Sequence, residues 1–228
     1  MSDLCDLKRS HKVLNILDDT DANGDIGKCK LTYFALKAIG EPIRLLLHYG
    51  GIAFEDCRIK RENWIRHKSD MPFGQVPVLE VNGKRAHQSV SICRYLGRLC
   101  KLNGVNEWED LEIDSTADTI NDLRHKITLY HYEADEEAKK SRRKPLYSET
   151  LPFYLERLEA IAKSNHGHLA LKKLTWVDFY FAGLLDYFQF MLEKNILEEY
   201  VNLKEVVNNV MTIPSVKEWI DQRPHSEC

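Results

Sequence analysis

The stretch Lys30-Leu31-Thr32-Tyr33-Phe34 is the most informative part of the sequence, because a short run of strand-forming residues places a tyrosine at its own end, just before a helix. Further along, Met71-Pro72-Phe73-Gly74-Gln75-Val76-Pro77-Val78-Leu79-Glu80 contains an X-Pro turn that enters a second strand. His87-Gln88-Ser89-Val90 then leads into another helix. A strand-end hydroxyl, an X-Pro turn and a Gln-Ser pair at a helix N-terminus can converge on one small anionic ligand.

The segments around these motifs alternate in type. The segment over 40–51 has apolar residues on one helical face and two glycines at its end. Asn82-Gly83 is a strong signal for a hairpin between two strands. The predicted elements are a helix over 40–51, strands over 53–59, 76–81 and 85–87, and a helix over 89–101. A β-α-β unit followed by a hairpin and a helix predicts a thioredoxin-type domain.

Beyond residues 103–107, where Gly104 interrupts a polar stretch, every segment has helical periodicity. Thr175 and Asp178 form a variant of the capping box at the start of a strongly apolar helix. The apolar residues at helical spacing are Leu111, Ile113, Ala117, Ile120, Leu123 and Ile127, then Leu151, Tyr154, Leu155, Leu158 and Ile161, and finally Phe181, Leu184, Leu185 and Phe188. The predicted fold class is an α/β N-terminal thioredoxin-like domain over 30–103 and an all-α C-terminal helical domain over 108–228, after a flexible extension over 1–29.

Composition narrows the class of protein. The chain has 228 residues, 43% of them hydrophobic and 29% charged, as in a globular protein. Its net charge of −3 gives no reason to expect nucleic acid or an anionic membrane as a partner. The start of the sequence is too polar for a secretory signal, and no apolar run is long enough for a membrane helix. The six cysteines lack metal-binding or CxxC spacing, so we expect a soluble cytoplasmic protein with reduced thiols.

In their order and register, these motifs resemble those of the cytosolic glutathione transferases, most closely the sigma class. The resemblance runs from about Lys30 to Pro224. It implies a homodimer that uses glutathione as its co-substrate. It also implies a glutathione site in the thioredoxin-like domain and a pocket for a small hydrophobic electrophile between the two domains.

The resemblance gives Tyr33 the catalytic role. The thiol of glutathione has a pKa of roughly 8.5, so an enzyme that uses it as a nucleophile must stabilise the thiolate. Lowering the pKa by two units requires about 3 kcal/mol, and one hydroxyl that donates to the thiolate supplies about 1.5–3 kcal/mol of this. From the residues alone, Tyr33 can equally be a strand-end tyrosine that packs on the core.

The other glutathione contacts also follow from the resemblance. Val76 presents its backbone to the cysteinyl part of glutathione ahead of a cis Pro77, and Gln88 and Ser89 bind the γ-glutamyl carboxylate. From the residues alone, Pro77 can be an ordinary trans proline and Ser89 a helix N-cap. Trp64 and Lys68 hold the glycyl carboxylate, and Asp122 reaches the γ-glutamyl amino group in the partner subunit. The implied contacts are Tyr33, Trp64, Lys68, Gln75, Val76, Pro77, Gln88, Ser89 and Asp122.

The electrophile pocket is expected beside Tyr33. The candidate residues are Phe34, Ile39, Arg124 and Tyr130, although Arg124 and Tyr130 also suit a helix surface. A related vertebrate prostaglandin D synthase has an arginine at the position of Ile39 and an acid of a Mg²⁺-binding cluster at the position of Asn121. The difference at Ile39 argues against that enzyme's substrate-binding pattern. The difference at Asn121 argues against a divalent-metal effect, so no metal is expected.

The predicted reaction is conjugation of the glutathione thiolate to a hydrophobic electrophile, such as an aldehyde from lipid peroxidation or an aryl halide, in detoxification. Two alternatives remain open. A glutathione-dependent isomerase of prostaglandin H leaves no conjugate, and a crystallin-like protein uses the fold without catalysis. A thiol-disulfide oxidoreductase is disfavoured, because the residue expected beside the sulfur is Tyr33 and not a cysteine.

The first 29 residues fall outside the resemblance. Asp19-Thr20-Asp21-Ala22-Asn23-Gly24-Asp25-Ile26 matches the first half of an EF-hand calcium loop. The twelfth position, which needs a bidentate glutamate, is Lys30, and this lysine also begins the first predicted strand. The motif is therefore better explained as part of a polar extension than as a calcium site.

Overall fold

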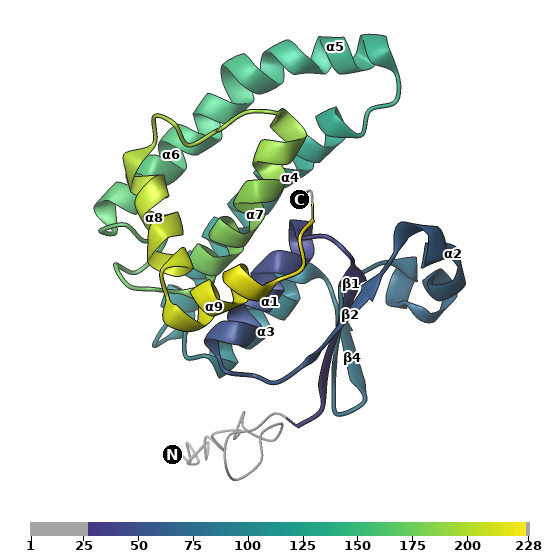
Figure 1. Cartoon of the computed structure of the whole chain (residues 1–228). Coiled ribbons are helices and arrows are strands. Elements are labelled where there is room, and N and C mark those ends of the chain that lie inside the picture. The colour runs from purple at the N-terminus through teal and green to yellow at the C-terminus, as the bar shows by residue number, and fades with distance from the viewer. Residues whose placement is uncertain (1–26, 227–228) are drawn as a thin grey trace, which may run out of the picture.

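The computed structural model describes residues 27–226 (Figure 1). The half EF-hand motif at 19–26, and all of the predicted extension except its last three residues, lie outside this range. The described chain consists of a four-stranded sheet with helices on both faces, followed by a helical half. This arrangement confirms the predicted fold class. The predicted domain limits, 30–103 and 108–228, stay a prediction.

The sheet has the strand order β2-β1-β3-β4. The central strand β1 (Cys29–Phe34) pairs in parallel with β2 (Glu55–Ile59) and antiparallel with β3 (Val78–Val81). β3 continues through the predicted Asn82-Gly83 turn into the edge strand β4 (Lys84–His87). Tyr33 therefore lies at the carboxyl end of a central strand, where parallel sheets commonly carry their ligand sites.

The helices of this half cover the two faces of the sheet unequally. α1 (Glu41–Tyr49) and α3 (Ser89–Leu99) pack together and against the helical half. The short α2 (Trp64–His67) lies on the other side of the sheet (Figure 1). Four 3₁₀ turns complete this half: η1 (Ala38–Gly40), η2 (Arg61–Asn63), η3 (Lys68–Asp70) and η4 (Pro72–Gly74).

The second half is helical throughout its regular structure. Its elements are α4 (Glu107–His131), α5 (Glu136–Pro145), the π-helical segment η5 (Leu146–Thr150), α6 (Leu151–Ser164), α7 (Trp176–Leu192), α8 (Val201–Met211) and α9 (Pro214–Gln222). α7 is the central helix and packs on α1, α3, α4 and α8. Among the residues described, no helix combines the length and the apolar character needed to cross a bilayer.

Two local features fix the position of α7. The buried Asp178 carboxylate accepts hydrogen bonds from the Thr175 amide at 2.7 Å and from the Leu169 amide at 2.7 Å, and the capping box predicted for this helix is confirmed. At Gly183, a Cβ would lie 2.7 Å from the Pro42 nitrogen. Glycine is therefore required for α7 to approach α1 so closely.

Charged residues lie in the interior beside β1. Arg44 and Glu41 of α1 are buried, with the Arg44 Nη1 atom 3.2 Å from the Glu41 Oε2 atom. Arg44 Nε also donates to the Asp56 carboxylate at 3.1 Å. The second Glu41 oxygen accepts from Trp219 Nε1 at 2.9 Å and from Arg223 Nη1 at 2.7 Å. This buried network connects α9 and the residue after it to the helix that follows Tyr33.

Several predicted positions were wrong in detail. Leu111 was predicted in the buried series of α4 but is 53% exposed, because it lies two residues before Ile113 and so faces away from the buried side of the helix. The strand predicted over 76–81 begins at Val78, since Pro77 has no N–H to donate to the sheet. The strand predicted over 53–59 begins at Glu55, and the helix predicted over 89–101 ends at Leu99.

Candidate active site

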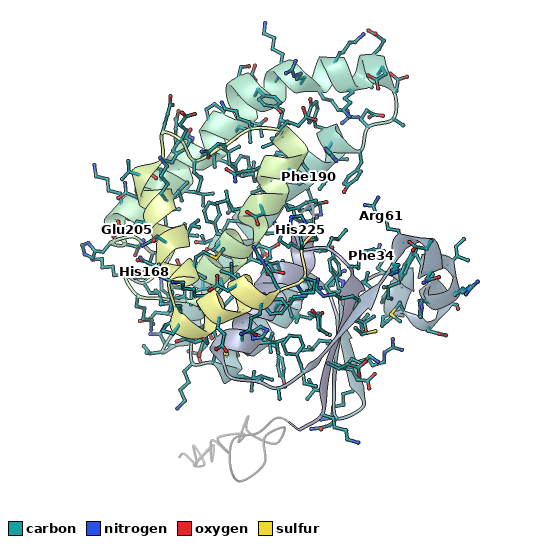
Figure 2. The ribbon with its side chains drawn as sticks, in the orientation of Figure 1. Phe34, Arg61, His168, Phe190, Glu205 and His225 are labelled. Atoms are coloured by element: carbon teal, nitrogen blue, oxygen red, sulfur yellow. The ribbon has the colours of Figure 1, made fainter. Side chains whose placement is uncertain are left out.

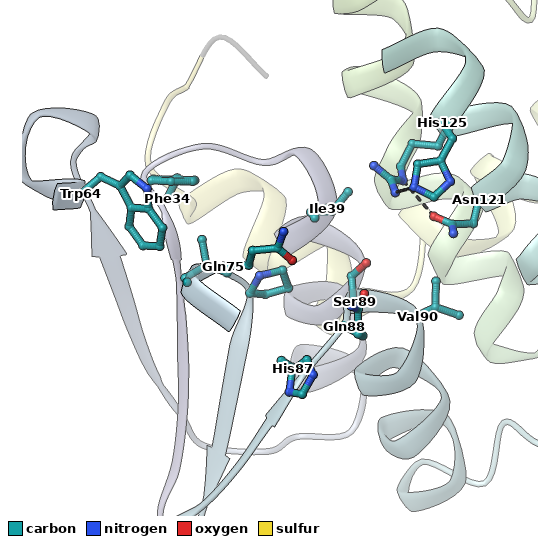
Figure 3. A pocket seen from close by; sticks show the side chains of 14 residues that line it. Phe34, Ile39, Trp64, Gln75, His87, Gln88, Ser89, Val90, Asn121 and His125 are labelled. Atoms are coloured by element: carbon teal, nitrogen blue, oxygen red, sulfur yellow. Dashed lines mark hydrogen bonds between the residues drawn. The ribbon is translucent and has the colours of Figure 1, made fainter. Parts of the chain in front are cut away.

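Two cavities of about 660 Å³ each lie on either side of Phe34, which contributes to both. The first cavity, shown in Figure 3, is lined by residues of η1, α2, the η4–β3 turn, the start of α3 and the middle of α4. The second cavity lies between the loop after Tyr33, the β2–η2 turn and the ends of α4 and α7. In Figure 2, Phe34 and Arg61 lie across its opening from Phe190.

Most of the predicted glutathione contacts lie in the first cavity. Those that line it are Trp64, Gln75, Val76, Pro77, Gln88 and Ser89. The Val76–Pro77 peptide is cis, which confirms the predicted isomer. On the Trp64 side of the cavity, the Phe34 and Trp64 rings pack edge to face with their centroids 5.2 Å apart. Short motifs separated by dozens of residues are therefore brought to one concave surface.

The start of α3 has an unusual backbone. Gln88, the N-cap residue, has φ 73° and ψ 109°, in the region that side-chain-bearing residues rarely adopt. Its side chain makes no capping hydrogen bond. The first-turn N–H groups of α3 and the positive end of its dipole are therefore suited to an anion in the cavity. Strained backbone of this kind is often found at functional sites.

The opposite wall comes from α4 of the helical half. Arg124 Nε donates to Asn121 Oδ1 at 2.9 Å, and an Arg124 Nη2 atom lies 2.8 Å from His125 Nε2. Burial and then the Arg124 charge lower the pKa of His125, so this side chain is neutral at pH 7 and Arg124 carries the charge. Tyr180 of α7 donates to Asn121 Oδ1 at 3.2 Å. Arg124 and Ile39, predicted for the electrophile pocket, line this first cavity and not the second.

Two predicted glutathione contacts do not line either cavity of the single chain. Lys68 is exposed, and its side chain runs beside Gly74, where a Cβ would lie 3.2 Å from Lys68 Cε. Because Gly74 lines the first cavity, Lys68 is at its margin. Asp122 is exposed on α4, one residue after Asn121. The roles of both residues stay predictions.

Tyr33 lines the second cavity and is 5% exposed. Its ring contacts two residues of the helical segments that follow. A Cβ at Gly40 would overlap the ring, and the Arg44 guanidinium lies 5.9 Å from the ring centroid. Gly40 and the buried Arg44 thus fix the plane of the phenol.

Two further phenols line this cavity from the helical half. The Tyr132 and Tyr187 hydroxyls are 3.1 Å apart. Burial, together with the hydrogen bond to Tyr132, raises the pKa of Tyr187, so it remains a protonated donor. Neither residue was predicted from the sequence, because Tyr187 lies on α7 and Tyr132 at the end of α4, and the relative rotation of these helices depends on tertiary packing. Tyr130, predicted for this pocket, instead lines a separate hollow with Tyr147.

His87 and His125, which also line the first cavity, were not predicted. His87 immediately precedes the Gln88-Ser89 pair, and this adjacency could have identified it as a residue of the cavity. Over residues 27–226, no group of three or more His, Cys, Asp or Glu side chains is arranged to hold a metal ion.

Comparisons with known proteins agree with this architecture. Residues 29–98 match the family described as "Glutathione S-transferase, N-terminal domain", and residues 121–223 match "Glutathione S-transferase, C-terminal domain". The chain is 50% identical over 198 residues to a glutathione S-transferase of Anopheles gambiae, covering 87% of this chain and 98% of the relative. It is 49% identical over 197 residues to glutathione S-transferase S1 of Drosophila melanogaster, covering 86% and 79%.

A solved structure of prostaglandin synthase D from Nilaparvata lugens has a TM-score of 0.84 and 45% identity, covering 87% of this chain and 100% of that one. The matches span both the sheet half and the helical half, including the segments that line the two cavities. The chain therefore belongs to the glutathione S-transferase family and is an enzyme of that family, with glutathione as the co-substrate.

Proposed function

We propose that this chain is a sigma-class transferase that joins the glutathione thiolate to hydrophobic electrophiles, with Tyr33 as the catalytic residue. One observation carries the proposal: Tyr33 lines the second cavity directly beside Phe34, and Phe34 also lines the first cavity. A co-substrate in the first cavity and an electrophile in the second would therefore meet next to the Tyr33 phenol.

Glutathione is assigned to the first cavity because its anionic groups match the donors there. The γ-glutamyl carboxylate lies at the start of α3, where Gln88 and Ser89 precede uncapped N–H groups. The glycyl carboxylate lies at the other end, between Trp64 and the marginal Lys68. Gln75, Val76 and Pro77 lie between these ends and contact the cysteinyl part. The sulfur is then directed towards Phe34 and the second cavity.

Tyr33 donates its hydroxyl hydrogen to the sulfur, which stabilises the thiolate by about 1.5–3 kcal/mol. The thiol proton leaves to solvent. The thiolate then forms a carbon–sulfur bond with the electrophile. When the electrophile is an α,β-unsaturated aldehyde, the electrons of the double bond move to the carbonyl oxygen, and water afterwards protonates the α carbon. With an aryl halide, halide leaves.

The second cavity favours the aldehyde among these electrophiles. Phe190 and Leu36 supply apolar surface, and the hydrogen-bonded Tyr132 and Tyr187 hydroxyls supply a donor. A donor aimed at the carbonyl oxygen stabilises the charge that develops there during addition. An aryl halide develops no such carbonyl charge. We therefore place products of lipid peroxidation first among the substrates, with detoxification as the role.

We assign the active unit to a homodimer in the cytoplasm. Phe73 of η4 is 85% exposed and Trp108 at the start of α4 is 68% exposed, and large exposed apolar side chains are common where protein surfaces associate. Asp122 is exposed on the same helix as Trp108 and is free to reach a partner's glutathione. The free thiols of Cys29, Cys57, Cys93 and Cys100 suit a reducing compartment.

The proposal is tested by incubating the full chain with glutathione and an α,β-unsaturated aldehyde of about nine carbons. The expected product has the summed mass of both reactants and forms faster than in a heat-inactivated sample. The absence of enzyme-dependent conjugate with either the aldehyde or 1-chloro-2,4-dinitrobenzene would overturn it.

A second candidate function is isomerisation of prostaglandin H, because the similar structure from Nilaparvata lugens is named as a prostaglandin synthase. In that reaction the thiolate attacks one oxygen of the O–O bond, and the other oxygen leaves as an alkoxide that takes up a proton and becomes a hydroxyl. The thiolate is released when the carbon that carries the sulfur-bound oxygen loses its proton and becomes a carbonyl. Product analysis separates the two functions, because the isomerase consumes no glutathione. The uncharged Ile39 in the first cavity favours the transferase.

A further inference from the structure

Residues 35–38 lead from β1 into η1 and form one wall of the second cavity; we call them the Tyr33 loop. Three of the four, Ala35, Leu36 and Ala38, line the cavity. The loop follows Tyr33 and Phe34 directly in the chain. A shift of the loop would therefore change the position of the Tyr33 phenol relative to the rest of the cavity.

The Tyr33 loop contains strained backbone. Ala38 has φ 33°, a positive value that is uncommon for residues with a Cβ, and its side chain is buried. Backbone of this kind persists only where the surrounding structure holds it, and it is concentrated at functional sites. The shape of the loop therefore depends on the contacts that hold it.

Two cations hold the Tyr33 loop, one through α1 and one through α7. The buried Arg44 of α1 donates from Nη1 to the Leu36 carbonyl at 2.9 Å. Lys37, which belongs to the loop, donates from Nζ to an Asp186 carboxylate oxygen of α7 at 2.6 Å. The Lys37 side chain is only 15% exposed. Its ion pair joins the sheet half of the chain to the helical half.

The two cations belong to one network of alternating charge. Arg44 pairs with Glu41 at 3.2 Å, and the other Glu41 oxygen accepts from Arg223 Nη1 at 2.7 Å. Arg223 Nη2 lies 3.6 Å from the same Asp186 oxygen that accepts from Lys37. Isolated ion pairs at a surface contribute little, whereas pairs within a network of several charges contribute more. Arg223 thus helps to hold the Asp186 carboxylate in place for Lys37.

The Asp186 end of the ion pair also lies next to the second cavity. Asp186 immediately precedes Tyr187 on α7, and Tyr187 lines the cavity. In Figure 2, Phe34 marks the wall on the side of the loop and Phe190 marks the wall on the side of α7. Lys37 and Asp186 themselves line neither cavity. The pair therefore connects two walls of the second cavity from outside.

We propose that Lys37 and Asp186 are positioning residues for the reaction: their ion pair sets the separation between the Tyr33 loop and α7, and so between the thiolate and an electrophile in the second cavity. This inference rests on the proposed function, which assigns the thiolate to Tyr33. A misplacement of reacting groups by about 1 Å can lower a rate about a hundredfold. Partial loosening of the loop should therefore have a smaller but measurable effect.

The competing explanation is that the pair only stabilises the fold, and the two explanations differ in the constants they affect. Loss of a purely structural contact lowers the melting temperature and leaves the kinetics of the folded protein unchanged. Loss of a positioning contact lowers kcat and raises the pKa of bound glutathione. The glutathione KM stays near its normal value in that case, because most of the first cavity is lined from other elements.

The test uses the full chain with glutathione and an α,β-unsaturated aldehyde of about nine carbons. Lys37→Gln keeps a long polar side chain but removes the charge. We expect kcat to fall about fivefold and the pKa of bound glutathione to rise by about half a unit, with the glutathione KM within about twofold. Lys30→Gln is the matched control and should leave all three constants unchanged, because Lys30 pairs with Glu55 at 3.0 Å near the other end of β1.

A second variant tests the pair itself. Asp186→Asn should also lower kcat about fivefold, and the double variant should fall no further, because the two side chains act through one contact. Thermal unfolding of each variant checks that the fold is retained. Independent effects that multiply to about twenty-five-fold would overturn the proposal, and so would a lower melting temperature with unchanged kcat.

The unaltered chain separates this inference from the proposed function. If it forms no conjugate with the aldehyde or with 1-chloro-2,4-dinitrobenzene, the proposed function is wrong and the inference falls with it. If it forms conjugate and the Lys37→Gln and Asp186→Asn variants do so at the same rate, the inference alone is wrong.

Discussion

The first and second cavities have similar volumes but are held in place differently. The first cavity, which we propose for glutathione, consists largely of turns and helix starts within the sheet half, where the backbone at Val76 and the N-terminus of α3 present polar groups directly. The second cavity, which we propose for the electrophile, depends on side chains such as Tyr132 and Tyr187, which meet only because α4 and α7 pack with one particular rotation. Backbone groups keep their positions when side chains change, whereas hydroxyls on helices do not.

This difference suits the two reactants. A co-substrate that is always the same molecule can be bound by groups that mutation cannot easily remove. A changing set of electrophiles is better served by replaceable side chains on long helices. The predictions that follow test whether the two cavities are as independent as this division implies, and they run from the largest expected effect to the smallest.

The largest effect is expected where the cavities meet. Tyr33→Phe keeps the ring in contact with Gly40 and Arg44 but removes the proposed thiolate donor. The pKa of bound glutathione should rise by one to two units, at about 1.4 kcal/mol per unit, and turnover at pH 6.5 should fall about tenfold or more. Thiolate absorbance of the complex as a function of pH measures the shift. Tyr132→Phe makes the same chemical change in the same cavity and is the control, because it should leave the pKa of bound glutathione unchanged. Conjugation at the normal rate in the Tyr33→Phe variant would contradict the assignment of Tyr33 as the thiolate donor.

A smaller effect is expected on glutathione binding across the dimer. Asp122→Ala should raise the glutathione KM about fivefold to tenfold and leave the electrophile KM nearly unchanged. The reason is that the γ-glutamyl ammonium group would lose its partner, which costs roughly 1 kcal/mol of binding free energy. Asp118→Ala, an exposed acid one turn earlier on α4, is the control. Steady-state kinetics with each substrate varied in turn measures both constants.

Mixing the Tyr33→Phe and Asp122→Ala proteins gives the sharper version of this test. In a mixed dimer, the intact Tyr33 belongs to the Asp122→Ala subunit and receives a normal Asp122 from its partner. One complete site should therefore return. If activity after confirmed subunit exchange equals only the sum of the two variants, each site belongs to a single chain.

The electrophile side should respond selectively. Tyr187→Phe removes the hydroxyl paired with Tyr132, and we expect kcat/KM for an unsaturated aldehyde to fall about threefold to fivefold, as for one neutral hydrogen bond. The value for 1-chloro-2,4-dinitrobenzene and the glutathione KM should stay within about twofold. Tyr130→Phe, which lies outside both cavities, serves as the control. Equal losses with both electrophiles would mean that the hydroxyl pair only supports the packing of α7.

The smallest effect is expected from the first residues of the chain. Deleting residues 1–26 should leave conjugation within about twofold of the full-length value, because the core begins with β1 at Cys29 and termini outside a core are usually tolerant of truncation. Calorimetry should detect no micromolar calcium binding to the full chain, since Lys30 replaces the required glutamate. A calcium site of that strength would restore the EF-hand hypothesis.

The same division explains what the sequence could predict. Strand periodicity, the Asn82-Gly83 turn and the Thr175 capping box are local signals, and they were enough for the fold class. Gln75, Val76, Gln88 and Ser89, which the resemblance assigns to glutathione, line the first cavity together, and their role in binding stays a prediction. The positive φ of Gln88 has no sequence signal, since it results from the join between β4 and α3.

Residues on long helices were predicted less well. Each step along a helix turns the side chain by about 100°, so Tyr130 lines one hollow and Tyr132 lines the second cavity, while His131 between them borders both. Arg124 falls in the first cavity for the same reason. Periodicity identifies the buried face of such a helix, but the packing partner decides which of the remaining faces borders a cavity.

The buried Glu41 carboxylate also constrains the order in which the protein can mature. Its donors Trp219 and Arg223 lie 178 and 182 residues further along the chain. At about 5–20 residues per second, a ribosome adds them roughly 10–40 s after Glu41. Burying the carboxylate without them would leave a charge without its full set of partners, at a cost of several kcal/mol. The α1 surface of the nascent chain must therefore stay hydrated until α9 arrives, and a chain released before that point would expose this surface to the cell's chaperones and proteases.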